Sequence, residues 1–156
     1  MDVFWEELTS GMPDARQLVH VLIRMIAATV LGAVVGRQRE KVGKPAGVRT
    51  HMLVSLGTAV VVLACSGVGM SPDGVSRIVQ GIVTGIGFLG AGAILKLDRE
   101  REIQGLTTAA GIWMTAAIGI AVGLGSLGVA LLSTVFTLVI LALAELLDRD
   151  RQTQND

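Results

Sequence analysis

The chain has 156 residues, of which 51% are hydrophobic and only 17% are charged. Its mean hydropathy is +0.65, whereas a soluble domain of this length is typically about 25% charged, so the composition excludes an ordinary soluble domain. Basic and acidic residues both number 13, so net charge indicates no class of partner, and the single cysteine, Cys65, excludes an intrachain disulfide framework.

Several apolar segments are long enough to cross a membrane, since a transmembrane helix needs roughly 20 mainly apolar residues. In chain order they are residues 18–36, 50–69, 78–96, 107–123 and 127–146. Only a short glycine-rich turn, Gly123 to Ser126, separates the last two, so a four-span alternative is open. The predicted fold class is all-α, a polytopic transmembrane helical bundle of about five spans occupying residues 18–147.

The distribution of basic residues predicts the orientation. Cytoplasmic loops carry an excess of Lys and Arg, and such residues concentrate after spans one, three and five: Arg37, Arg39, Lys41, Lys44, Arg49, Lys96, Arg99, Arg101, Arg149 and Arg151. The other side has only Arg16 and Arg77. We therefore expect residues 1–17 to be extracytoplasmic and residues 148–156 to form a cytoplasmic tail, which favours five spans over four. The acidic N-terminus argues against a cleavable signal peptide.

A weak internal repeat relates spans one and two to spans three and four. Leu31-Gly32-Ala33 aligns with Leu89-Gly90-Ala91, and the loop residues Gly47 to Thr50 align with Gly105 to Thr108. We interpret this pattern as a duplicated helical hairpin whose two copies share one orientation, so the pseudo-twofold axis would follow the membrane normal. Chance similarity is the alternative.

Each of these loops ends in a glycine followed by threonine. Gly47 and Gly105 are suited to a positive φ, and Thr50 and Thr107 are suited to cap the next helix. One interpretation is a simple helix-starting turn. The other is that the two helix N-termini form a cytoplasmic anion site to which Arg49 adds charge.

Span three is unusually rich in glycine. Its glycines are Gly81, Gly85, Gly87, Gly90 and Gly92, and they lie on both faces of a helix. Small residues let transmembrane helices approach closely, so we predict helix packing here and regard span three as the central helix or a subunit interface. Three of them form a GxGxxG pattern, but a dinucleotide site needs a βαβ unit around it, so nucleotide binding is not expected.

Arg24 is the one charge that lies clearly inside an apolar segment, and His51 lies at the start of another. Arg24 either extends its side chain toward the outer membrane surface or makes a buried contact, with Asp73 as the candidate partner. His51 is interpreted as a hydrogen-bonded residue at a membrane boundary. No set of residues has the spacing of a metal site, and no nucleophile–base pair or phosphate-binding loop is recognisable. We expect no metal, no cofactor, no nucleic-acid binding and no enzyme activity.

Three motifs together resemble a known family. They are Lys44 to Val54 (KPAGVRTHMLV), Gly85 to Gly92 (GIGFLGAG), and Leu106 to Ala110 with Trp113 and Ala116 to Gly119. In this order they are similar to the MgtC/SapB family of bacterial inner-membrane proteins over about residues 20–140.

The resemblance implies a multi-pass protein of the bacterial plasma membrane. Some members are linked to growth in low magnesium and to survival inside host cells, and membrane-protein partners such as the ATP synthase are implied for virulence-associated members. The family brings no settled transport activity or catalysis. Besides the span-three glycines and Gly47, the positions here that match its motifs are Arg24, Arg39, Glu40, Arg49, Thr50, Asp73, Arg77 and Thr107, and these are the candidate functional residues.

The chain departs from the family pattern in three places. The usual Gly-x-Glu-Arg after span one is replaced by Gly36 to Arg39 without the acid, and Met114 stands where virulence-type members have cysteine. The chain also ends ten residues after span five, where those members continue into a soluble domain. It is therefore more similar to the short SapB-like branch.

Two functions follow as expectations. The first is a non-enzymatic membrane protein that serves adaptation to stress or magnesium limitation through membrane-protein partners. The second is a small transporter or channel for an ion or small solute, with a path lined by Arg24, Asp73, Gln80 and Thr84. Because five spans enclose little volume, we expect a homo-oligomer, with a dimer favoured.

Overall fold

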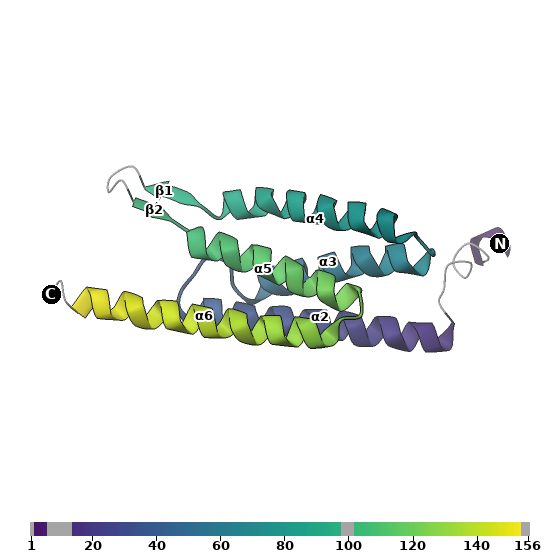
Figure 1. Cartoon of the computed structure of the whole chain (residues 1–156), viewed down its shortest axis with the longest axis horizontal. Coiled ribbons are helices and arrows are strands. Elements are labelled where there is room, and N and C mark those ends of the chain that lie inside the picture. The colour runs from purple at the N-terminus through teal and green to yellow at the C-terminus, as the bar shows by residue number, and fades with distance from the viewer. Residues whose placement is uncertain (1, 6–13, 98–101, 154–156) are drawn as a thin grey trace.

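The computed structural model describes residues 2–5, 14–97 and 102–153 (Figure 1). Its elements are α2 (Ala15–Lys41), α3 (Val48–Gly67), α4 (Pro72–Gly92), β1 (Leu95–Leu97), β2 (Glu102–Gln104), α5 (Leu106–Gly123) and α6 (Leu127–Thr153). A helical turn at residues 2–5 precedes them. Residues 6–13 of the predicted extracytoplasmic segment lie outside the described part of the chain, as do Arg99 and Arg101 of the predicted cytoplasmic loop.

The five long helices are each long and apolar enough to cross a membrane, which confirms the predicted polytopic bundle. The four-span alternative is wrong, because Gly125 adopts a positive φ of 84° and separates α5 from α6. Helix α6 continues to Thr153, so the predicted tail begins as helix. The predicted side of the membrane for each terminus remains a prediction.

Successive helices run in opposite directions, so the connections gather at two ends (Figure 1). We call one the hairpin end: it contains the α2–α3 loop, the β1–β2 hairpin and the C-terminal part of α6. The other, the turn end, contains the start of α2 and the α3–α4 and α5–α6 turns. The described parts of the segments predicted to be cytoplasmic therefore lie at the hairpin end.

The two strands at the hairpin end are a feature that the sequence analysis did not predict. β1 and β2 pair antiparallel, with Leu95 opposite Gln104 and Leu97 opposite Glu102. They take up the segment assigned to the end of span three and the following loop. The bundle itself remains wholly helical.

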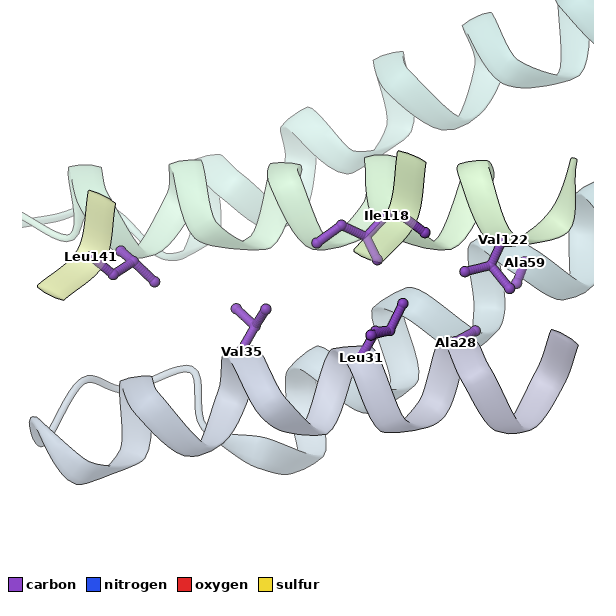
Figure 2. Close-up of a cluster of buried hydrophobic side chains, with 8 residues drawn as sticks. Ala28, Leu31, Val35, Ala59, Ile118, Val122 and Leu141 are labelled. Carbon is purple, nitrogen blue, oxygen red and sulfur yellow. The ribbon is translucent and has the colours of Figure 1, made fainter. Parts of the chain in front are cut away.

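Helix α5 lies at the centre of the bundle and contacts each of the other four long helices. Its residues Ile118 and Val122 are fully buried, and they join Ala28, Leu31 and Val35 of α2 in one apolar cluster (Figure 2). Helix α4 is peripheral, with only Ile86 and Gly90 buried. The prediction that span three is the central helix is therefore wrong; its role as a subunit interface stays a prediction.

Close helix packing comes from glycine pairs four residues apart. A Cβ added at Gly32 or Gly36 of α2 would overlap the backbone of α3 at His51 or Val48, respectively. On the other side of α3, a Cβ at Gly123 of α5 would lie 2.7 Å from Cβ of Val62. Because glycine has no side chain, α3 approaches both α2 and α5 closely at these positions, as helices do at small residues in membrane proteins.

The two matched loops have different backbones. Gly105 has the positive φ that the sequence predicted, at 96°. Gly47 has φ −95° and ψ −158°, which is extended backbone, so the same prediction for Gly47 is wrong. The N-cap residues of α3 and α5 are glycines, which have no side chain to cap the helix. Thr50 and Thr107 lie inside the helices and not at the N-cap positions. Their predicted capping role is wrong. The duplicated hairpin remains a prediction.

Candidate functional site

Buried and half-buried polar side chains from four helices meet toward the hairpin end of the bundle. We call them the polar cluster: Gln38 and Arg39 of α2, His51 and Ser55 of α3, Thr115 of α5 and Glu145 of α6. Because polar groups buried in a membrane protein cost free energy unless they are paired, such a concentration marks a candidate functional site.

Arg39 carries the buried charge of the cluster. It is only 2% exposed, and its Nε and Nη2 atoms have no hydrogen-bond partner among the described residues. The Glu145 carboxylate interacts with it electrostatically and also accepts a hydrogen bond from Nε2 of the neighbouring Gln38. A buried cation needs such compensation. Arg39 and Gln38 therefore connect the end of α2 to α6.

His51 is held by a chain of hydrogen bonds between α3 and α5. Its Nδ1 atom lies 2.7 Å from Oγ1 of Thr115, and that hydroxyl donates to the Gly111 carbonyl at 2.9 Å. The tautomer of the ring sets which of the two atoms, Nδ1 or Oγ1, donates in this bond. The other ring nitrogen, Nε2, is buried without a partner in the described chain. The ring of His51 also interacts with the backbone of Ala46, in the loop before α3.

The polar character continues along the α3–α5 interface. Ser55 is fully buried and its Oγ has no partner among the described residues. One turn further, Oγ1 of Thr58 lies 3.2 Å from the Ala116 carbonyl of α5 and 3.0 Å from the Val54 carbonyl of its own helix. The hydroxyl of Thr58 thus has acceptors on both helices. A row of polar side chains therefore extends inward from the cluster.

The first turn of α3 already has an anion. Oε2 of Glu40, from the end of α2, accepts a hydrogen bond from the backbone N–H of Val48 at 3.1 Å. A carboxylate here complements the positive end of the α3 dipole. Arg49 is exposed beside it. The predicted anion site at the start of α3 is thus occupied by the chain's own Glu40.

Arg24 lies at the turn end and makes a buried contact, but with a different partner from the one predicted. Its Nη1 donates to the Gly123 carbonyl at 3.2 Å, close to the C-terminus of α5. Asp73 is exposed in the first turn of α4, and no interaction joins it to Arg24 within the described residues. The predicted Arg24–Asp73 pair is therefore wrong.

The predicted transport path is not assembled within one chain. Asp73, Gln80 and Thr84 are all exposed on α4, and the Thr84 hydroxyl donates to the Gln80 carbonyl of its own helix. Arg24 contacts α5 instead. Arg77, the remaining candidate on α4, is exposed beside a groove that α4 shares with α3.

The five α4 glycines that the sequence predicted to pack contribute little to packing inside the chain. A Cβ added at Gly90 would contact Ala109 of α5 at 3.7 Å. At the other four glycines, Gly81, Gly85, Gly87 and Gly92, an added Cβ would meet nothing within 4 Å. Their predicted packing role therefore applies within the chain to Gly90 alone.

Sequence reasoning missed most of the polar cluster. It singled out Arg39 and His51 but not Gln38, Ser55, Thr115 or Glu145. One signal was available for the last of these, because Glu145 is the only acid between Glu102 and Asp148 and ends an otherwise apolar span. Among the described residues no group of His, Cys, Asp and Glu side chains could hold a metal ion.

Comparison with known proteins agrees with the resemblance in the motifs. Residues 25–150 match the MgtC family. The chain is 42% identical over 130 residues to a protein of Escherichia coli K12 named "Putative magnesium transporter YhiD", covering 77% of the chain and 58% of YhiD.

Two further relatives show the same level of similarity. Protein SrpB of Synechococcus elongatus is 42% identical over 130 residues, which cover 76% of the chain and 71% of SrpB. Protein MgtC of Salmonella typhimurium is 43% identical over 127 residues, which cover 81% of the chain and 53% of MgtC. The chain thus spans little more than half the length of YhiD and MgtC. No solved structure matches it.

Proposed function

Because the chain belongs to the MgtC family, we propose that it is a non-enzymatic membrane protein that serves adaptation to magnesium limitation or stress by contacting other membrane proteins. The five apolar helices support a multi-pass membrane protein. The magnesium link comes from the name of the relative YhiD. The bacterial inner membrane, with the C-terminus in the cytoplasm, is part of the same proposal.

One observation carries the proposal: the half of α4 nearest the hairpin end has a face that no other described segment of the chain covers. Gly85 and Gly92 share this face with Phe88, which is 83% exposed. The comparable glycines of α2 and α5 are instead closed against α3. Glycines that admit a second backbone beside a protruding aromatic ring suit contact with another transmembrane helix.

Site-specific photo-crosslinking in intact bacterial cells tests this surface. A photoreactive amino acid replaces Phe88, and the matched control replaces Phe136 of α6, which is 64% exposed. We expect a discrete protein adduct from position 88 that position 136 does not give, and we expect Gly85→Leu to abolish it. Equal adducts from both positions, or none from position 88, would contradict the proposal.

The physiological part of the proposal needs a separate measurement. In a strain that lacks the protein, the wild-type chain should restore growth in low magnesium, whereas Gly85→Leu should restore it poorly at equal membrane abundance. Full restoration by Gly85→Leu would show that growth in low magnesium does not require the α4 surface.

Transport of an ion or small solute is the second candidate. The name of YhiD favours it, as do the unpaired polar atoms of Arg39, His51 and Ser55. Magnesium flux into proteoliposomes should then be abolished by Ser55→Leu, which would block the α3–α5 polar row. Protein adducts at position 88 without any flux would favour the first candidate.

A further inference from the structure

A groove lies between α3 and α4 toward the turn end of the bundle. Its volume is about 600 Å³, within the roughly 300–1,000 Å³ typical of small-molecule pockets. The apolar side chains of Val61, Ile78 and Ile82 line it, and Gly81 leaves it open. Because both helices are membrane spans, the groove opens toward hydrocarbon.

Arg77 is the only charged residue that lines this groove. It is exposed, and its guanidinium has no hydrogen-bond or ion-pair partner among the described residues. Asp73, one turn earlier, lies in the first turn of α4, where a carboxylate is stabilised by the helix dipole. No ion pair within the described chain joins it to Arg77, which leaves the arginine available.

Arg77 lies near enough to the start of α4 for its side chain to reach a lipid phosphate. Arg77 is five residues after Pro72, so it lies about 8 Å along the helix at 1.5 Å per residue. A long arginine side chain can extend from that depth to the membrane interface. There its planar guanidinium can donate two hydrogen bonds to a phosphate group.

We propose that this groove binds a membrane phospholipid, with one acyl chain between α3 and α4 and the phosphate on Arg77. The apolar walls recognise the chain, and the unpaired cation at the groove recognises the headgroup. The site lies on the turn-end half of α4, away from Gly85, Phe88 and Gly92, so it does not rest on the proposed function.

Native mass spectrometry of the purified full chain, titrated with dioleoyl phosphatidylglycerol in detergent, tests the site. We expect one lipid to remain bound to the wild-type protein at collision energies that remove the others. Arg77→Ala should weaken that retained binding by about tenfold, which corresponds to loss of one strong charged contact. Arg16→Ala, which removes an exposed arginine at the same end of the bundle, should not.

A second pair of variants tests the groove without changing charge. A Cβ at Gly81 or at Gly85 meets no described atom within 4 Å, so a side chain can begin at either position without a clash at its first carbon. Only Gly81 lines the groove, so Gly81→Leu should remove the retained lipid and Gly85→Leu should preserve it. The proposal is overturned if Arg77→Ala and Gly81→Leu bind lipid as their controls do, which would mean adventitious annular lipid only. Because Gly85→Leu should instead abolish the crosslink at position 88, the two proposals can fail separately.

Discussion

The guanidinium of Arg24 sits at the C-terminal end of α5, where its Nη1 donates to the carbonyl oxygen of Gly123. The last carbonyl groups of a helix lack intrahelical partners and form the negative end of its dipole. Gly125 keeps the approach open, since an added Cβ there would lie 2.5 Å from Nη2 of Arg24. A charge inside the first span thus fixes the turn between the last two helices.

Replacing Arg24 by alanine should destabilise the protein, because the Gly123 carbonyl loses its donor in a membrane environment. Hydrogen bonds to charged groups contribute about 1.5–3 kcal/mol, and we expect a loss in that range. Thermal unfolding in lipid nanodiscs measures it, with Arg16→Ala as the exposed control on the same helix. A midpoint no lower for Arg24→Ala than for the control would show that the contact is not stabilising.

Alanine at Gly119 should be poorly tolerated. The added Cβ would overlap Oγ1 of Thr58 and the Ser55 carbonyl, and overpacking of this kind typically costs about 1–3 kcal/mol. Gly85→Ala is the matched control, because an added Cβ at that position meets no described atom within 4 Å. There alanine should be neutral or stabilising by up to about 1 kcal/mol, since it is a better helix former than glycine. Similar unfolding midpoints for the two variants would refute this packing arrangement.

Glu40→Ala should loosen the first turn of α3. The variant removes the acceptor of the Val48 N–H, and loss of an N-terminal cap costs about 1 kcal/mol. Hydrogen exchange at the Val48 amide should become faster, while Glu40→Gln, which keeps an acceptor oxygen, should change it less. If exchange at Val48 is unaffected in Glu40→Ala, the carboxylate does not cap the helix.

Glu145→Ala should destabilise the protein. The variant removes the acceptor of the Gln38 side chain and the carboxylate that interacts electrostatically with the buried Arg39. Hydrogen bonds to charged groups contribute about 1.5–3 kcal/mol, and because Glu145 is only half-buried we expect a loss near the lower limit. Thermal unfolding in nanodiscs gives the loss, and Glu145→Gln should fall between the wild-type protein and Glu145→Ala. Wild-type stability in Glu145→Ala would mean that Arg39 is compensated by other groups.

The spans were predictable because hydropathy and length are local properties. Each predicted span overlaps one observed helix, and the helix ends differ by a few residues where capping decides them: Ser71 accepts from the Gly74 N–H and so starts α4 earlier than hydropathy alone indicates. The identity of the central helix was not predictable in this way. Glycine density favoured α4, yet the glycines that pack are those facing α3 from α2 and α5.

For the candidate residues too, the sequence indicated the positions but not the contacts. Arg24 and Arg39 were recognisable as charges in or beside apolar segments, but their contacts were not. The bond from Arg24 to Gly123 joins residues 99 positions apart, and that between His51 and Thr115 joins residues 64 apart. No spacing rule connects such pairs, because the meeting faces depend on how each helix is rotated in the bundle.

By itself, the sequence determined the number of spans, the alternation that brings the basic loops to one end, and the family. A bilayer of fixed thickness and a chain with local hydropathy leave little freedom in those features. Only the tertiary structure decided that Glu145 compensates Arg39, that Glu40 caps α3, and that α4 keeps an open face. Those outcomes depend on which side chains meet when helices pack at close range, and missing or added atoms at single positions determine that packing.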